Sequence, residues 1–258
     1  MERRDFLAMS LAAAAGTAKG EGMTGAPLSR EYYQLRRYAL QSGPQTQITE
    51  NYFAKALIPA LNRLGIQPVG AFRLEYGPET PAYFLLMPCP SLATLVEVDL
   101  RLAQDAAFLK LAEPFWNAPA ARPAFERVES TLLSAFEGWP KLIVPKQEKR
   151  IFQLRTYESP SYQHHILKVA MFHDGEFELF RKAGFGQVFY GDALVGQRLP
   201  CLTYLLSFAD LVALDASWDR FRNDPDWQKL SHLPKYSEEG IVSNITNLIL
   251  SPLACSQI

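Results

Sequence analysis

The sequence predicts an α+β protein built from two tandem ferredoxin-like β-α-β-β-α-β units. We expect their antiparallel sheets to face each other as a pseudo-dimeric α+β barrel. Three observations predict this fold. The segment "YYQLRRY" at 32–38 returns as "IFQLRTY" at 151–157. Other matches, such as Asp105 with Asp224, keep the same spacing of 119 residues. Each copy also has the same order of strand and helix signals, which indicates an internal duplication.

The first copy opens with an aromatic strand and continues with an amphipathic helix. Phe53, Leu57 and Leu61 recur at four-residue steps, which is typical of a helix with one apolar face, and Gly65 is placed to end it. The sequence "GPETP" predicts a turn between two further strands. The expected strands are 32–40, 68–76, 82–87 and 129–136, and the expected helices are 48–64 and 91–111.

The second copy repeats this order. Its last helix should break near "RNDPDW", because Asp224 can cap a new helix and Pro225 suits the first helical position. The expected strands are 151–157, 186–196, 202–208 and 243–250, and the expected helices are 162–182 and 210–230. The domain prediction is a lead at 1–29, repeats at 30–139 and 150–258, and a linker at 140–149.

A ferredoxin-like sheet carries its helices on one face and leaves the other face bare. Two such sheets in one chain can cover each other through their bare faces. Two sheets that cover each other predict the barrel, and they leave the oligomeric state open.

Composition excludes several classes of function. The chain has 258 residues, 48% of them hydrophobic, and a formal net charge of −1, so no basic field would gather nucleic acid. No apolar run is long enough to span a membrane. The three cysteines, Cys89, Cys201 and Cys255, form no disulfide framework and no metal-binding pattern, although one bridge is compatible with the sequence.

The N-terminus has the form of an export signal. Arg3 and Arg4 precede an apolar run at 6–15 and a small-residue site at 16–18. "RRDFL" resembles the twin-arginine signal. We therefore expect export, with a periplasmic location. The alternatives are an ordinary disordered N-terminus and a mitochondrial-type presequence, and Glu2 and Asp5 argue against the presequence.

The repeated strand places Gln, Arg and Tyr on one face, because side chains alternate along a strand. We expect this face to point between the sheets. An enclosed guanidinium needs a carboxylate, water or an anionic ligand as its partner, and Glu75 is an internal candidate. A satisfied structural network is the alternative. The predicted ligand-binding residues are Gln34, Arg36, Tyr38, Gln153, Arg155 and Tyr157.

Two further residues are candidate catalytic bases. Glu176 occupies the place of Leu57, on a helix face that should be apolar, and His173 lies beside the same stripe. The alternative places Glu176 at the edge of the stripe and His173 at the surface. The four histidines include no pair with the helical spacing of a zinc site, so no metal is predicted.

The segments "YYQLRRY", "RIFQLRTYES" and "DPDWQKL" give the chain a resemblance to the NIPSNAP family. It covers most of the chain after residue 30 and implies a fold related to dimeric α+β barrels. The second copy is the better match, because Phe108 stands where the second copy has Trp227. Gln34 and Gln153 replace the glutamate common in the family, which removes a possible neutraliser of Arg36 and Arg155.

The resemblance implies no settled activity, since related barrels include cofactor-free monooxygenases, haem-handling enzymes and binding proteins. We expect binding of a small organic or anionic molecule between the sheets and name no cofactor. The alternatives are a cofactor-independent oxygenase or isomerase, and a structural or interaction module without a pocket.

Overall fold

The computed structural model describes residues 30–41, 43–237 and 240–258. The predicted export signal lies outside these residues. Within the described ranges, no helix combines the length and hydropathy needed to cross a membrane.

The first repeat runs from β1 to β4 in the order that the sequence predicts. Its second helical region is divided into three short helices, and its first helix begins at Pro44 rather than at Ile48. The strands are β1 (Tyr32–Ala39), β2 (Gly70–Tyr76), β3 (Ala82–Cys89) and β4 (Arg127–Ala135). The helices are α1 (Pro44–Tyr52), the π-helical turn η1 (Phe53–Leu57), α2 (Ile58–Arg63), α3 (Leu92–Val96), α4 (Val98–Leu102) and α5 (Ala106–Trp116).

The second repeat has the same order from β5 to β8. Asp224 caps α9 by accepting a hydrogen bond from the amide of Asp226, as Asp105 caps α5 in the first repeat. The strands are β5 (Ile151–Glu158), β6 (Gly186–Val195), β7 (Cys201–Phe208) and β8 (Asn244–Pro252). The helices are α6 (Tyr162–Met171), the π-helical turn η2 (Phe172–Glu176), α7 (Phe177–Ala183), α8 (Leu211–Arg222), α9 (Pro225–Ser231) and α10 (Pro234–Ser237).

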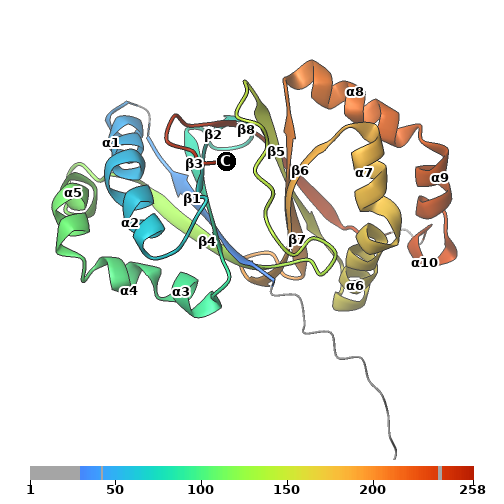
Figure 1. Cartoon of the computed structure of the whole chain (residues 1–258), viewed down its shortest axis with the longest axis horizontal. Coiled ribbons are helices and arrows are strands. Elements are labelled where there is room, and N and C mark those ends of the chain that lie inside the picture. The colour runs from blue at the N-terminus through green and yellow to red at the C-terminus, as the bar shows by residue number, and fades with distance from the viewer. Residues whose placement is uncertain (1–29, 42, 238–239) are drawn as a thin grey trace, which may run out of the picture.

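The two sheets join edge to edge into one closed barrel with the strand order β1-β3-β2-β8-β5-β7-β6-β4. Strand β2 pairs antiparallel with β8, and β4 pairs antiparallel with β6, so each repeat covers the sheet edges of the other. Helices α1 to α5 lie outside the barrel on one side and α6 to α10 on the other (Figure 1). The predicted pseudo-dimeric α+β barrel is confirmed.

One end of the barrel interior is closed by aromatic packing. The rings of Tyr33 and Phe189 lie 4.9 Å apart, as do those of Phe72 and Phe152, and Ile258 is fully buried against this cluster. An eight-stranded barrel is just wide enough for side chains to fill, and large apolar residues fill it at this end.

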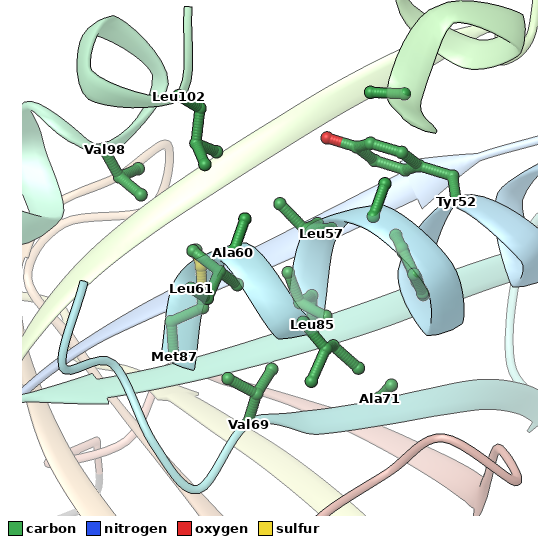
Figure 2. Packing of buried hydrophobic residues seen from close by; sticks show 14 of the residues in the cluster. Tyr52, Leu57, Ala60, Leu61, Val69, Ala71, Leu85, Met87, Val98 and Leu102 are labelled. Carbon is green, nitrogen blue, oxygen red and sulfur yellow. The ribbon is translucent and has the colours of Figure 1, made fainter. Parts of the chain in front are cut away.

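The outer face of each sheet packs under its own helices. Figure 2 shows this cluster in the first repeat, where Leu57 and Leu61 from the helices meet Leu85 and Met87 from β3. The second repeat has an equivalent and more aromatic cluster, which includes Phe180.

The prediction that the Gln/Arg/Tyr face points between the sheets is wrong. Tyr33 and Phe152 belong to the barrel interior, whereas Tyr38 and Tyr157 belong to the clusters under the helices. Strand parity alone could not decide, because both faces of the opening strands carry large side chains. The narrow barrel core admits apolar groups, while the helices supply polar and aromatic partners for the arginines.

Candidate functional site

A cavity of about 490 Å³ lies between the outer face of the second repeat's sheet and its helices. Strands β5 and β8 contribute one wall, and α6, η2, α8 and α9 contribute the others. Its lining combines aromatic rings with charged groups. The residues are Gln153, Arg155, Tyr157, Lys168, Glu176, Leu214, Asp215, Trp218, Phe221, Arg222, Trp227, Val242, Ile245 and Asn247.

Arg155 is the central cation of this cavity. Its guanidinium stacks 4.4 Å from the centre of the Trp218 ring and donates a hydrogen bond of 3.0 Å from Nη2 to the Tyr157 hydroxyl. Its Nε is buried without a hydrogen-bond partner, and Arg155 forms no ion pair with a carboxylate of the described residues. An arginine remains charged in a protein, so the cavity holds a guanidinium that pairs with no carboxylate of the described residues, Asp215 of the lining included.

A hydrogen-bond network holds the neighbours of Arg155 in place. The Trp218 indole donates to Gln153 Oε1 at 2.8 Å, and Gln153 Nε2 donates to Asn247 Oδ1 at 2.9 Å. The Tyr204 hydroxyl donates to that of Tyr157 at 2.7 Å. Burial raises the pKa of Tyr204 well above its usual value, so this phenol stays a donor. The Tyr157 hydroxyl accepts two hydrogen bonds and keeps its own proton available.

A buried ion pair stands beside Arg155. Lys168 Nζ lies 2.7 Å from Glu176 Oε2, and both side chains are almost fully buried, at 5% and 2% exposure. The ammonium also lies 4.7 Å from the centre of the Phe172 ring. Each charge of this pair compensates the other, so Glu176 is the partner of Lys168 and not of Arg155.

In the first repeat, the equivalent arginine, Arg36, is neutralised by the carboxylate of Asp99. Arg36 Nη1 and Nη2 donate to the two oxygens of Asp99, at 2.9 and 3.0 Å. Asp99 precedes Trp218 by the repeat spacing of 119 residues, and Thr49 and Leu57 stand where the second repeat has Lys168 and Glu176. The two equivalent arginines therefore differ: Asp99 neutralises Arg36, whereas Arg155 has no carboxylate partner among the described residues.

The π-helical turn η2 places Glu176 against the cavity. A π turn adds a residue to the helix and redirects the side chains that follow, and such turns are frequent at functional sites. Gly175 within η2 has φ 158° and ψ −17°, outside helical values. The first repeat has the matching turn η1 with Ala56 at this place and no such irregularity. The irregular backbone is thus specific to the repeat that has the cavity.

The structure brings together half of the predicted set. Gln153, Arg155 and Tyr157 line the cavity with Glu176, although they face the helices rather than the other sheet. In the first repeat, Gln34 Oε1 accepts from Arg36 Nη2 at 3.2 Å, and Tyr38 is buried beside them.

Two other candidates lie away from the cavity. His173 is exposed, and its ring nitrogens are bonded to the carbonyl of Val169 and to the amide of Gly138. Glu75 accepts from Arg73 and Ser251, so it is not the partner of Arg36.

The sequence-based predictions missed Lys168, Trp218 and Asn247. Two signals in the sequence could have pointed to Lys168 and Trp218. Lys168 lies eight residues before Glu176, so both fall on the same helix face, and aligning the repeats places Trp218 opposite Asp99. Charged residues on an apolar helix face indicate a buried pair or a site.

The lining can bind a flat anion. Trp218, Trp227 and Phe221 supply aromatic surface, and Arg155 supplies charge and donors. Among the described residues, no group of three or more His, Cys, Asp or Glu side chains is arranged to hold a metal ion.

Comparison with known proteins agrees with the duplicated fold. The NIPSNAP family model matches residues 33–137 and again 152–257. No curated protein matches the chain significantly.

Two solved structures that match most of the chain share its fold. A protein of Lactobacillus acidophilus NCFM, described as a "putative monooxygenase", superposes with a TM-score of 0.57 at 9% identity, covering 86% of this chain and 94% of its own. A Fusobacterium nucleatum protein with the same description gives 0.56 at 10% identity, covering 87% and 93%. A NIPSNAP family protein of unknown function from Agrobacterium tumefaciens is 18% identical over 43% of this chain and 94% of its own, with a TM-score of 0.36. Because the family model covers both repeats, the chain belongs to the NIPSNAP family and carries its domain twice.

Proposed function

We propose that the second repeat binds a small aromatic anion in the cavity around Arg155, with the anionic group on the guanidinium. The observation that carries the proposal is the half-buried Arg155 with an unpaired Nε and no carboxylate partner among the described residues. An enclosed charge without a counter-ion is costly unless something compensates it, and a bound anion would do so.

The surroundings define the ligand class. A volume of about 490 Å³ falls within the range typical of small-molecule sites. Trp218 already covers one face of the guanidinium, so a ligand carboxylate would approach along its edge. Trp227 and Phe221 offer apolar surface for an attached ring.

Calorimetric titration with 2-naphthoate tests the proposal, with 2-naphthamide as the neutral analogue. We expect the naphthoate to bind and the amide to bind at least tenfold more weakly. Arg155→Gln should weaken naphthoate binding by about tenfold or more, because charge-assisted hydrogen bonds contribute about 1.5–3 kcal/mol.

Arg36→Gln is the matched control, since it changes the equivalent arginine that Asp99 already neutralises. It should leave naphthoate binding unchanged. Equal binding by the wild type and Arg155→Gln, or equal binding of the naphthoate and the amide, would overturn the proposal.

A second candidate function is a cofactor-independent oxygenase or isomerase acting on a phenolic or quinone-like substrate. It is favoured by Glu176, a buried carboxylate on the cavity wall that could accept a proton from a bound substrate. The two whole-chain structural relatives described as monooxygenases have the same fold, which is an analogy of fold and not of chemistry.

Oxygen uptake with a panel of anthrone-type and quinol-type compounds separates this candidate from simple binding. An enzyme should consume oxygen with a member of the panel, and Glu176→Gln should abolish the uptake while it still binds 2-naphthoate. Absence of uptake with every compound would leave binding as the function.

A further inference from the structure

A second cavity lies inside the barrel, at the end opposite the aromatic cluster. Its volume is about 420 Å³. The hairpin loops that follow β2 and β6 both contribute to its rim, through Pro78 and Glu79 from one repeat and Gly196 to Arg198 from the other. The cavity is thus shared by the two repeats and separate from the site around Arg155.

The floor of this cavity is apolar and comes from inward-facing strand residues. Leu74, Phe84, Leu154 and Leu248 are each at most 8% exposed and belong to the barrel core. Cys201 also lines the cavity, and burial raises the pKa of its thiol to about 11. The floor therefore offers surface for a hydrocarbon group and no thiolate.

The rim carries three arginines, each in contact with a carboxylate, and Arg37 and Arg127 have the closer ion pairs. Arg37 is paired with Glu79 at 2.6 Å and with Glu129 at 3.0 Å. Arg127 donates to Glu129 at 2.9 Å. Glu79 and Glu129 therefore form ion pairs with the two arginines of the first repeat.

Arg198 differs from the other two. Only its Nη1 is bonded, to Thr246 Oγ1 at 2.8 Å and to Glu158 Oε1 at 3.3 Å, and its Nε–Nη2 edge bonds no described residue. The side chain is 54% exposed at the mouth. The equivalent position in the first repeat is Glu79. The mouth of the cavity therefore has a cation, Arg198, on the side of the second repeat and a carboxylate, Glu79, on the side of the first.

We propose that the barrel mouth binds a medium-chain aliphatic carboxylate, with its hydrocarbon chain on the apolar floor and its carboxylate on the free edge of Arg198. A guanidinium edge presents two parallel N–H donors that match the two oxygens of a carboxylate. The Thr156 and Thr203 hydroxyls, 2.9 Å apart, also line the cavity. Their shared hydrogen bond leaves one proton for a polar head.

Titration of the full chain with decanoate, followed by NMR of the leucine methyl groups, tests this proposal. We expect the methyl signals of Leu74, Leu154 and Leu248 to shift most, and decanol to bind several-fold more weakly. Arg198→Gln should weaken decanoate binding by about fivefold to tenfold, a modest loss because the rim is exposed to water. Arg198 is exposed, so its substitution should not affect folding.

A second variant tests the floor independently of the head. Thr156→Phe places a ring within the mouth and should abolish the methyl shifts caused by decanoate. Arg155→Gln serves as the control for the other site and should bind decanoate like the wild type. Unchanged decanoate affinity in both Arg198→Gln and Thr156→Phe, equal affinity for decanol, or loss of decanoate binding in Arg155→Gln would overturn the proposal.

Discussion

At the scale of single residues, the difference between Asp99 and Trp218 determines the surroundings of two equivalent arginines. Asp99 neutralises Arg36 through two hydrogen bonds. Trp218 covers Arg155 with its ring and gives its indole proton to Gln153. The ion pair with Asp99 stabilises the first repeat, whereas the guanidinium of Arg155 in the second repeat remains free to bind an anion.

Asp99→Asn should lower the free energy of unfolding by about 1–2 kcal/mol, because it removes the counter-ion of a guanidinium that is only 7% exposed. The estimate is moderate because Asp99 is itself 61% exposed. Urea unfolding of the two proteins measures the difference.

Glu97→Gln is the control for this prediction. Glu97 pairs with Arg101 on the surface, where both partners are largely exposed, so its loss should cost at most about 0.5 kcal/mol. A cost for Asp99→Asn no larger than that of Glu97→Gln would contradict the role given to Asp99.

The sequence pointed to Gln153, Arg155, Tyr157 and Glu176, which line the cavity, but it placed the three strand residues on the wrong face of the sheet. Strand alternation shows which residues share a face and not which side of the sheet that face meets. Trp218 was missed because an aromatic residue on a helix is usually a packing residue.

At the scale of elements, the seams between the repeats close the barrel. At one seam, Glu75 on β2 accepts a hydrogen bond from Ser251 on β8, directly across from its neighbour Arg73. The Ser251 hydroxyl lowers the pKa of Glu75, with a further contribution from Arg73.

The pH dependence of this contact has a definite sign. Because the folded pKa of Glu75 is lower than the unfolded value near 4.3, ionised Glu75 stabilises the fold above that pH, and the contribution is lost as the pH falls below it. Glu75→Gln should therefore be less stable than the wild type by about 0.5 kcal/mol at pH 7, and the gap should narrow at pH 3.

Urea unfolding at both pH values measures this gap. Glu113→Gln, at an exposed position of α5, is the control and should show little dependence of the gap on pH. A gap for Glu75→Gln that stayed constant or widened at pH 3 would reject the assignment.

The π-helical turn next to the cavity makes a second prediction at this scale. Gly175→Ala should lower the free energy of unfolding by about 1–3 kcal/mol, because a side chain is strained at its backbone angles. It should also weaken 2-naphthoate binding, since a displaced η2 would change the shape of the cavity wall.

The reverse substitution at the equivalent position is the control. Ala56→Gly in η1 should cost about 1 kcal/mol for backbone entropy and leave naphthoate binding unchanged. Naphthoate binding in Gly175→Ala as tight as in the wild type would separate this turn from the site.

Most elements could be predicted, because apolar periodicity and turn residues are local signals. The breaks in the helices could not. No local sequence signal predicts the π turns η1 and η2. The two turns lie at equivalent positions, 119 residues apart, which indicates that both repeats retain the same turn.

At the scale of the whole molecule, the two repeats share one core inside the barrel. Tyr33 and Phe72 from the first repeat pack with Phe152 and Phe189 from the second. Neither sheet can keep its inner face buried without the other.

The chain should consequently unfold in a single cooperative transition, with the calorimetric enthalpy equal to the van't Hoff enthalpy. Differential scanning calorimetry measures both quantities. Two resolved transitions, one for each repeat, would show that the shared core does not couple them.

The duplication made the barrel predictable, because each sheet has helices on one face only and the two bare faces can cover each other. The cavities were not predictable, because they depend on a few positions where the repeats have diverged. Asp99 against Trp218 distinguishes the helix-side site, and Glu79 against Arg198 distinguishes the barrel mouth.

A crystal structure of the protein with bound 2-naphthoate would show directly whether Arg155 holds an anion. We expect the carboxylate within hydrogen-bond distance of the Arg155 guanidinium, with the ring system against Trp227 and Phe221. A naphthoate found only elsewhere, or Arg155 neutralised by a carboxylate of the chain itself, would contradict this expectation.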